Sequence, residues 1–361
     1  IYCLKRLSND APGGKNLNSA SIKDVAELAG VSIATVSRCM NTPDKVSEKT
    51  RIKVQDAILK TGYTPNTLAQ SFRRGRTNIV MVVLPSIGDP FFTLVMQGIR
   101  NAADAKGYSI IINESRFNTM TADEIAAMVV SRQTDGIILL ASMSPFGTEV
   151  LSTKSHRTLP IVVGCETVAP ELADFPSVHI DNVAAAREAT AHLVAQGHER
   201  IGLIAGTAAS LLTKDREFGY RAAMRDAELD IEEGWIVNGD LNIEGAIRAT
   251  RSLLNHAHQP TAIFCTTDEM AIGCLHAVKS AGLQVPQDIS IMGFDDTRYA
   301  AVTDPPLTTI SQPAIEIGER VMYRLCRDID QGRQSGEGDS KPELVPHRLI
   351  IRQSVAPPAS D

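Results

Sequence analysis

The sequence contains few cysteines, and they are dispersed. Six occur in 361 residues. They are Cys3, Cys39, Cys165, Cys265, Cys274 and Cys326. None forms a CxxC pair or lies near a histidine at the spacing of a zinc site, so neither a metal site nor a disulfide framework is predicted. A reducing cytoplasm is the expected compartment.

Long apolar runs are also absent. No segment approaches the length of about 20 apolar residues that spans a bilayer, so no membrane partner is predicted. Residues 1–20 are rich in Asn, Gly and Ser and lack the apolar core of a signal peptide. We expect this segment to be a disordered leader. The missing signal peptide also disfavours a secreted solute-binding protein.

Catalytic signatures are the third absence. The sequence has no G-x-S-x-G elbow, Walker loop, HExxH or G-x-G-x-x-G motif. We therefore predict that the protein is not an enzyme and needs no cofactor.

Charge is distributed unevenly along the chain. Residues 1–78 carry 13 Lys and Arg against 6 Asp and Glu, a balance of +7, whereas the remainder carries 23 against 36, or −13. Attraction to phosphates is thus confined to one end of the chain. DNA binding explains this distribution better than a solvated charge run without a partner does. The basic end is predicted to contact DNA.

Residues 21–64 form the segment that most narrows the function. Val25, Ala26 and Ala29 share one helical face, Gly30 supplies the left-handed residue that ends this helix, and Ser32 can cap a second helix. Two short helices joined by a tight turn are typical of a helix-turn-helix unit. On periodicity alone, an ordinary three-helix surface lobe remains the alternative.

The second and third helices extend this pattern. Inward-facing positions are predicted at Val31, Val36 and Met40, and in the third helix at Val54, Ala57, Ile58 and Thr61. Ser47 is expected to cap the third helix and Gly62 to end it. The outer face and start of the second helix then carry Ile33, Ala34, Ser37 and Arg38, where a recognition helix meets base edges.

The strings VSIATVSR and NTPDKVSEKTR resemble the DNA-binding unit of the LacI/GalR family of bacterial transcriptional regulators. The resemblance implies a homodimeric repressor that binds double-stranded operator DNA under the control of a small molecule. It implies that Arg38 donates to a guanine, that Ile33 and Ala34 contact neighbouring base edges, and that Thr35 and Ser37 hold phosphates.

Residues 65–78 are polar and basic and are predicted to be a hinge. Leu68, Ala69 and Phe72 give a helix of one to two turns, too short to be stable alone in water. In the LacI/GalR family the matching segment is a hinge helix that enters the minor groove, which implies DNA contacts for Ala69 and Phe72. Phe72 stands where the family usually has Leu, and it can still unstack a base step. A basic linker without a specific role is the alternative.

From Ile79 the chain alternates short apolar runs with helical stretches, which predicts buried parallel strands in a doubly wound α/β fold. The strands are expected in IVMVVLP, YSIIINE, DGIILLAS, LPIVVG, SVHIDN, RIGLIAG, TAIFCTTD and ISIMGFDD. Helices are expected at 92–106, 184–196 and 269–281.

The resemblance implies that residues 79–357 form a periplasmic-binding-protein type I effector domain of two doubly wound α/β lobes. Lobe 1 is expected at about 79–179 and 311–340, and lobe 2 at about 180–310 and 341–357. The chain would then cross between the lobes near Ile180, Ile310 and Lys341.

Candidate effector-binding residues follow the predicted strands. Phe91 and Phe92 in DPFF could stack on a ring, although helix-start packing is the commoner role of such residues. The resemblance implies that Ser142 and Glu166 face the ligand and that Arg216 and Asp295 bind it. An Arg–Asp pair suits vicinal hydroxyls, because one donates a fork and the other accepts. Without the resemblance, a structural ion pair is the better interpretation.

Two positions have a structural and a functional interpretation. Thr266 and Glu269 have the spacing of a capping box, so Thr267 either serves the helix start or contacts the effector. For Asp181 in HIDN we favour a helix cap.

Within the family, DPFF, ILLASMSPF, CETVAPEL and DPPLTTISQP resemble the cytidine-responsive repressors. A nucleoside is therefore the expected effector. A sugar or sugar phosphate is the alternative.

Overall fold

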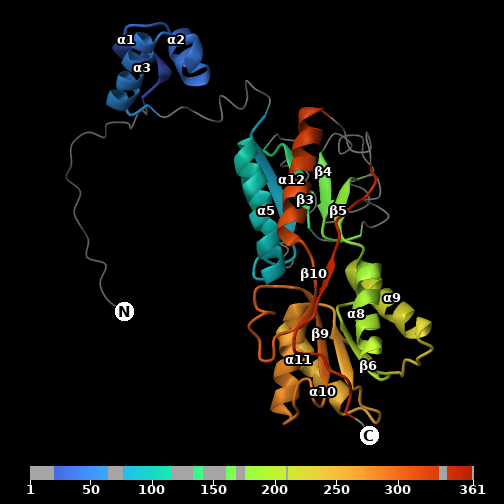
Figure 1. Ribbon diagram of the computed structural model, residues 1–361. Helices are drawn as coiled ribbons and strands as arrows, with labels where there is room; N and C mark the ends of the chain where they lie inside the picture. Colours follow the sequence, from blue (N-terminus) through green and yellow to red (C-terminus); the bar gives the residue numbers. More distant parts are fainter. Residues whose placement is uncertain are drawn as a thin grey trace, which may run out of the picture. The chain divides into compact units, whose positions relative to one another are not determined.

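A computed structural model describes residues 20–63, 76–114, 133–140, 160–167, 175–208, 210–332 and 340–359. The chain divides into two compact units, residues 1–74 and 75–361 (Figure 1). The hinge residues Ala69 and Phe72 lie outside the described residues, as does Ser142.

The first unit is a three-helix head. Its helices are α1 (Ile22–Ala29), α2 (Ile33–Asn41) and α3 (Glu48–Thr61), with a short 3₁₀ turn, η1 (Pro43–Lys45), after α2. Gly30 ends α1 at a φ of 66°, and the Ser32 hydroxyl accepts a hydrogen bond from the Thr35 N–H at the start of α2. Ser47 stands at the N-cap of α3, but its hydroxyl bonds the Thr50 hydroxyl instead of a backbone N–H.

The predicted apolar face closes a small core in the head. Buried side chains from all three helices meet in it, with partly buried Val31, Met40 and Ile58 packed against them. The buried set is Val25, Ala26, Ala29, Val36, Cys39, Val54 and Ala57. The helix-turn-helix arrangement predicted from the sequence is confirmed, because these positions recur at helical spacing and leave the outer face of α2 polar or exposed.

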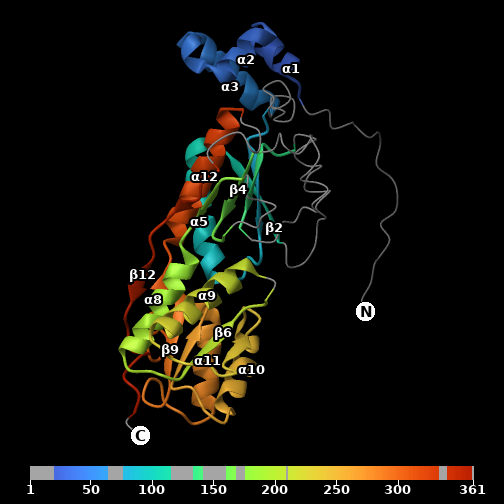
Figure 2. The same ribbon diagram turned by 90° about the vertical axis from the view of Figure 1, so that its right-hand side faces the viewer.

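The second unit contains two six-stranded sheets (Figures 1 and 2). The first has the order β11-β5-β4-β3-β1-β2, and all its strands are parallel. Its strands are β1 (Ile79–Leu84), β2 (Ser109–Glu114), β3 (Gly136–Leu139), β4 (Ile161–Gly164), β5 (Ser177–His179) and β11 (Glu343–Leu344). Helices α5 (Pro90–Lys106) and α12 (Ala314–Asp330) lie side by side along this sheet.

The second sheet has the order β12-β10-β9-β8-β6-β7 and is parallel except for β12. Its strands are β6 (Ile201–Ala205), β7 (Ile236–Asn238), β8 (Ala262–Cys265), β9 (Ser290–Asp295), β10 (Thr308–Ser311) and β12 (Arg348–Ile350). The helices beside it are α8 (Asn182–Ala195), α9 (Leu211–Asp226), α10 (Ile243–Leu254) and α11 (Asp268–Ser280).

Alternating side chains of the second sheet enter two separate cores. Leu203 and Phe264 pack in one core with residues of α8 and α9, whereas Ile204 and Ile263 pack in the other with residues of α10 and α11. This period of two follows from the pleat of a strand covered on both faces. The doubly wound α/β class predicted from the apolar runs is confirmed.

The chain passes between the two sheets three times: after β5, after β10 and after β11. The last passage differs from the expectation, which placed it near Lys341. Glu343 and Leu344 of β11 pair in parallel with Val178 and His179 of β5, so this segment still belongs to the first sheet. The return to the second sheet therefore begins after Leu344.

Candidate functional site

Helix α2 carries the residues predicted to contact DNA. Ile33 is 43% exposed, and Ala34 and Arg38 are also exposed. Thr35 and Ser37 are half-buried, and the Thr35 hydroxyl lies 2.9 Å from the Ser32 hydroxyl. The apolar face of α2 is buried in the head, which leaves this row of side chains on the outer surface.

A buried arginine organises the second unit at the carboxyl ends of the strands of its second sheet. Arg216 on α9 is 2% exposed, and its Nη1 lies 3.7 Å from Oδ1 of Asp295, the last residue of β9. Its Nε donates to Asn182 Oδ1 at 3.1 Å, and Nη1 also donates to the Thr266 carbonyl. The guanidinium carbon stands 3.6 Å from the centre of the Phe294 ring. Arg216 and Asp295, predicted from widely separated motifs, are thus brought together.

Asp295 is held in an unusual backbone conformation. Its φ is 115°, a region that L residues rarely adopt, and its side chain is 7% exposed. Gln312 Nε2 donates to Oδ1 of Asp295 at 2.6 Å. Burial raises the pKa of Asp295 well above its usual range, and Arg216 acts in the opposite direction. Strained, buried charges of this kind concentrate at functional sites.

Two carboxylates beside the first sheet interact electrostatically with Arg216. Glu166 follows β4 and is 6% exposed, and Asp89 precedes α5, where its carboxylate accepts from the Phe91 N–H at 2.8 Å. Burial lowers the pKa of Arg216, and the carboxylates of Asp295, Glu166, Asp268 and Asp89 oppose that shift. We call these five residues, Asp89, Glu166, Arg216, Asp268 and Asp295, the inter-sheet cluster.

The two sides are also joined by a direct hydrogen bond. The hydroxyl of Thr167, just after β4, donates to the carboxylate of Asp215 on α9. Phe91 and Phe92 are 7% and 8% exposed and pack edge to face with ring centres 5.4 Å apart. Both rings belong to the core beneath the first sheet, so most of their surface is already covered by protein.

At the start of α11 the predicted capping role of Thr267 is confirmed: it is the N-cap, and its hydroxyl accepts from the Met270 N–H at 3.2 Å. The T-x-x-E spacing, which would place the N-cap at Thr266, is one residue off. Thr266 directly follows β8, and its carbonyl accepts a hydrogen bond from Arg216 Nη1. The expected cap at Asp181 is confirmed, because its carboxylate accepts from the Ala184 N–H at 2.9 Å.

Sequence reasoning gave Asp268 only a possible role at the helix start and did not place it in the site. This carboxylate is fully buried and accepts from the Thr297 N–H at 2.6 Å and from the Thr309 hydroxyl at 2.7 Å. Burial raises the pKa of Asp268 to about 7, against the lowering effect of those two hydrogen bonds. The only signal in the sequence was its place three residues after a buried strand, which an ordinary helix start also explains.

Four buried polar atoms around the inter-sheet cluster have no hydrogen-bond partner within the described residues. They are Asn182 Nδ2, Thr213 Oγ1, Thr266 Oγ1 and Gln312 Oε1. Asn182, Thr266 and Gln312 use their other polar atoms to hold Arg216 or Asp295. Buried polar groups are normally paired, so these four atoms are the hydrogen-bonding capacity that the described residues leave unused.

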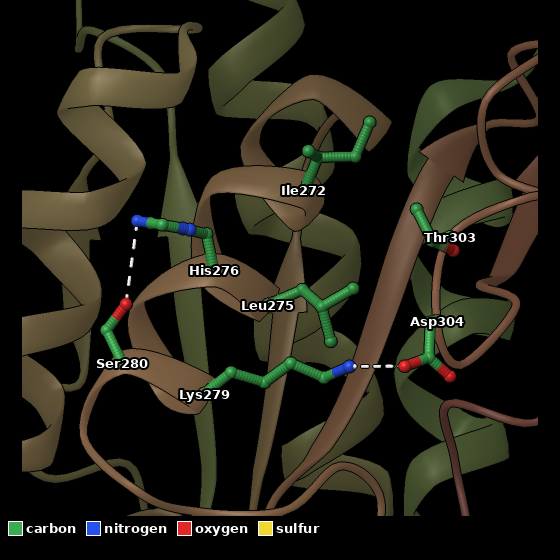
Figure 3. Close-up of a pocket in the computed structure, with 7 residues that line it drawn as sticks. All are labelled: Ile272, Leu275, His276, Lys279, Ser280, Thr303 and Asp304. Carbon is green, nitrogen blue, oxygen red and sulfur yellow. Dashed lines mark hydrogen bonds and ion pairs between the residues drawn. The ribbon is translucent and has the colours of Figure 1, made fainter.

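A separate surface pocket lies on α11 (Figure 3). Its volume is about 440 Å³, and Lys279 and Asp304 meet across it at 2.8 Å. The lining residues are Ile272, Leu275, His276, Lys279, Ser280, Thr303 and Asp304. None of the predicted effector residues lines it, so it is distinct from the inter-sheet cluster.

Among the described residues, no group of three or more His, Cys, Asp or Glu side chains could hold a metal ion. Among the same residues, no helix combines the length and the apolar character that a bilayer crossing requires.

A helix-turn-helix head joined to a two-sheet body with a buried polar cluster defines the class of ligand-responsive DNA-binding regulators. The model of bacterial regulatory proteins of the lacI family matches residues 21–66, and that of the periplasmic binding protein-like domain matches residues 190–355. The chain belongs to the LacI family, as a transcriptional repressor with an effector domain.

Individual relatives agree with this assignment. The HTH-type transcriptional repressor CytR of Escherichia coli (strain K12) is 39% identical over 341 residues, which cover 94% of this chain and 98% of the relative. The repressor PurR of Serratia proteamaculans (strain 568) is 35% identical over 339 residues, covering 93% and 97%. These relatives are transcriptional regulators and not enzymes.

Solved structures give the same result. The Lac repressor dimer bound to operator and the anti-inducer ONPF has a TM-score of 0.80 and 27% identity, covering 94% of this chain and all of that one. The complex of the regulator CelR with cellobiose has a TM-score of 0.69 and 28% identity, covering 93% and 99%.

Proposed function

We propose that this repressor is controlled by a nucleoside whose ribose binds at the inter-sheet cluster. The observation that carries the proposal is the buried Arg216–Asp295 pair with four unpaired polar atoms around it. The forked guanidinium donates and the carboxylate accepts, which matches the two neighbouring hydroxyls of a ribose. The similarity to CytR and to the cytidine-responsive repressors supports a nucleoside.

The position of the cluster supports allosteric control. Asp89 and Glu166 follow strands of one sheet, whereas Arg216 and Asp295 belong to the other, so a ligand that contacts both sides favours one arrangement of the two sheets over others. We propose that this arrangement controls the pairing of the hinge segments, including Ala69 and Phe72, in a homodimer on operator DNA. Ser142, Phe91, Phe92 and Thr267 remain proposed contributors to the effector site.

A screen of ligands tests the nucleoside assignment. We expect cytidine or another nucleoside to raise the melting temperature of the protein, because a ligand at 100 times its dissociation constant adds about 2.7 kcal/mol to folding stability. The panel contains nucleosides, free bases, pentoses, hexoses and their phosphates. Stabilisation by a hexose alone would contradict the proposal and favour the alternative, a sugar-controlled repressor, which the cellobiose complex of CelR supports.

For the head we propose that Arg38 donates to a guanine, that Ile33 and Ala34 contact adjacent base edges, and that Thr35 and Ser37 hold phosphates. The exposure of Ile33, Ala34 and Arg38 on the outer face of α2 supports this assignment. Thr35 and Ser37 are half-buried, so part of each side chain packs on the head. The exposed part of each side chain can reach the DNA backbone.

We expect Arg38→Ala to weaken binding to a selected operator by about 1–3 kcal/mol and to relax the preference at one base position. Fluorescence anisotropy with the operator and with single-base variants of it measures both effects. Lys53→Ala is the matched control, because it removes an exposed positive charge from α3 and is expected to weaken binding to all sequences alike. An unchanged base preference in Arg38→Ala would contradict the assignment.

A further inference from the structure

The carboxylate of Asp268 joins three elements beside the second sheet. Asp268 is the first residue of α11, and its side chain is fully buried. Its Oδ2 accepts from the Thr297 N–H at 2.6 Å, and its Oδ1 accepts from the Thr309 hydroxyl at 2.7 Å. Thr297 follows β9, and Thr309 belongs to β10. One side chain therefore fixes the start of a helix, the loop after one strand and the neighbouring strand.

A glycine makes room for this carboxylate. Gly293 on β9 pairs with Thr309 on β10, so it lies next to the residue that Asp268 contacts. A Cβ at Gly293 would clash with Oδ1 of Asp268 and would lie 2.6 Å from Cδ2 of Leu307. Any side chain at position 293 would therefore push the carboxylate away from Thr309. The contact depends on the residues of two adjacent strands as well as on the helix that carries Asp268.

The loop that Asp268 holds carries Asp295 in a strained conformation. The φ of Asp295 is 115°, and that of the next residue, Asp296, is 55°. L residues rarely adopt such angles, which persist only where the surrounding structure fixes the backbone. The hydrogen bond from the Thr297 N–H to Asp268 is one such contact, two residues after Asp295. Without it, the backbone after β9 is expected to relax and to carry the Asp295 carboxylate with it.

The second hydrogen bond of Asp268 acts on a partner of Asp295. Gln312 directly follows β10, and its Nε2 donates to Oδ1 of Asp295 at 2.6 Å. Thr309 lies three residues before Gln312 in the same extended segment. By holding Thr309, Asp268 fixes the strand from which Gln312 reaches Asp295. Both hydrogen bonds of Asp268 thus converge on the position of one carboxylate.

Asp268 also lies close along the chain to a contact of Arg216. The carbonyl of Thr266, two residues earlier, accepts from Arg216 Nη1, and Thr267 between them is the N-cap of α11. Nη1 of Arg216 in turn lies 3.7 Å from Oδ1 of Asp295. The helix start that carries Asp268 therefore contacts one member of the Arg216–Asp295 pair, while the Asp268 carboxylate holds the loop of the other.

We propose that Asp268 is a positioning residue of the effector site, which acts through Thr297 and Thr309 to hold Asp295 where it accepts from a ligand hydroxyl. The inference rests on the proposed function, namely that Arg216 and Asp295 bind the effector. Asp268 does not contact the ligand in this role, because both of its oxygens have protein partners. A purely structural role predicts a loss of stability with no change in the effector affinity of the folded protein.

Thr309→Val tests the proposal, because valine has nearly the shape of threonine and lacks the hydroxyl that reaches Asp268. The full-length protein is titrated calorimetrically with cytidine, at a temperature well below its measured unfolding. We expect the dissociation constant to rise about tenfold, as when one hydrogen bond to a charged group is lost. Thr309→Ser restores the hydroxyl and is expected to bind within about threefold of the wild type.

Asp268→Ala removes both contacts at once. It is expected to weaken cytidine binding by at least about tenfold, because the loop and the strand are released together. Thr309→Val, which keeps the carboxylate and changes one hydroxyl, provides the same comparison if Asp268→Ala does not fold.

Thr250→Val is the matched control for the loss of a buried hydroxyl. Thr250 is fully buried in the same unit, and its hydroxyl donates to the Ala246 carbonyl at 2.7 Å within α10, which carries none of the predicted effector residues. Its melting temperature is expected to fall, and its affinity for cytidine to stay that of the wild type. Wild-type affinity in Thr309→Val would overturn the proposal, as would an equal loss of affinity in Thr250→Val.

The nucleoside assignment and the positioning role fail in different ways. If the wild type does not bind cytidine, the nucleoside assignment is wrong, and the same variants are titrated with ribose and with glucose. Weaker binding of either sugar by Thr309→Val, with Thr250→Val unchanged, would still support the role of Asp268. Binding of cytidine that is equal in the wild type and Thr309→Val would leave the proposed function standing and contradict the positioning role. No binding of cytidine, ribose or glucose by the wild type would contradict both.

Discussion

Replacing Arg216 with methionine is expected to destabilise the second unit by about 3–5 kcal/mol and to abolish its response to effector, because Asp295 is left buried without its cation. The substitution also removes the donors to Asn182 Oδ1 and to the Thr266 carbonyl. Thermal and urea unfolding measure the first effect, and calorimetric titration with cytidine measures the second.

A second substitution separates stability from ligand binding. Asp295→Asn added to Arg216→Met removes the uncompensated charge while keeping an oxygen that accepts from Gln312. We expect the double variant to recover much of the lost stability and none of the ligand binding. A structural ion pair alone would predict recovery of both, so a double variant that responds normally to cytidine would contradict the proposed site.

Arg221→Met on the same helix is the control for the loss of an arginine. Arg221 is exposed and pairs with Glu217 at 2.7 Å one turn away. Ion pairs of this kind contribute about 0–1 kcal/mol. Equal destabilisation by Arg216→Met and Arg221→Met would show that the buried cluster contributes no more than a surface pair.

Alanine at Gly98 or Gly318 is expected to destabilise the second unit by about 1–3 kcal/mol or more, because α5 and α12 cross in backbone contact at these two glycines. A Cβ at Gly98 would lie 2.0 Å from the Ile315 carbonyl oxygen, and one at Gly318 would lie 2.1 Å from the Val95 carbonyl oxygen. Neither neighbour is a side chain that can turn away. The helices must separate, which opens the core that both share with the first sheet.

Thermal unfolding monitored by near-ultraviolet circular dichroism measures this loss. Gly88→Ala is the control, since its Cβ would make an ordinary contact of 3.5 Å with the Ser86 hydroxyl. An alanine in an open helix position would instead add about 1 kcal/mol of helix propensity. A gain in stability for Gly98→Ala would therefore show that the two helices are not in backbone contact.

Predictions from the sequence were reliable where the residues that decide a structure lie within one helix, turn or strand. Gly30 and Ser32 mark the turn of the head because a left-handed residue and a side-chain cap act on their immediate neighbours. The buried strands of both sheets were visible as apolar runs for the same reason. β7, β10, β11 and β12 were not predicted, since none of them lies in an apolar run as continuous as those of the other strands.

The errors arose where two local rules competed. Thr266 and Thr267 are both good caps; the predicted role of Thr267 at the helix start is confirmed, but the box spacing to Glu269 pointed to Thr266. The Thr266 carbonyl accepts a hydrogen bond from Arg216, a residue 50 positions away that no local pattern connects to it. The third passage between the sheets comes after the expected boundary near Lys341, because Glu343 pairs with β5 of the first sheet. A strand of two residues is too short for its sequence to predict this pairing.

The sequence by itself determined the class of this protein: the head, the alternating α/β body, the uneven charge and the resemblance to a family of regulators all follow from patterns within a few turns or strands. Only the tertiary structure decided how Arg216, Asp295, Asp268 and the orphan atoms of Asn182 and Gln312 share one buried place. The physical reason is that burial and electrostatic coupling depend on distances in space between elements far apart in the chain, and those distances are set by the packing of two sheets.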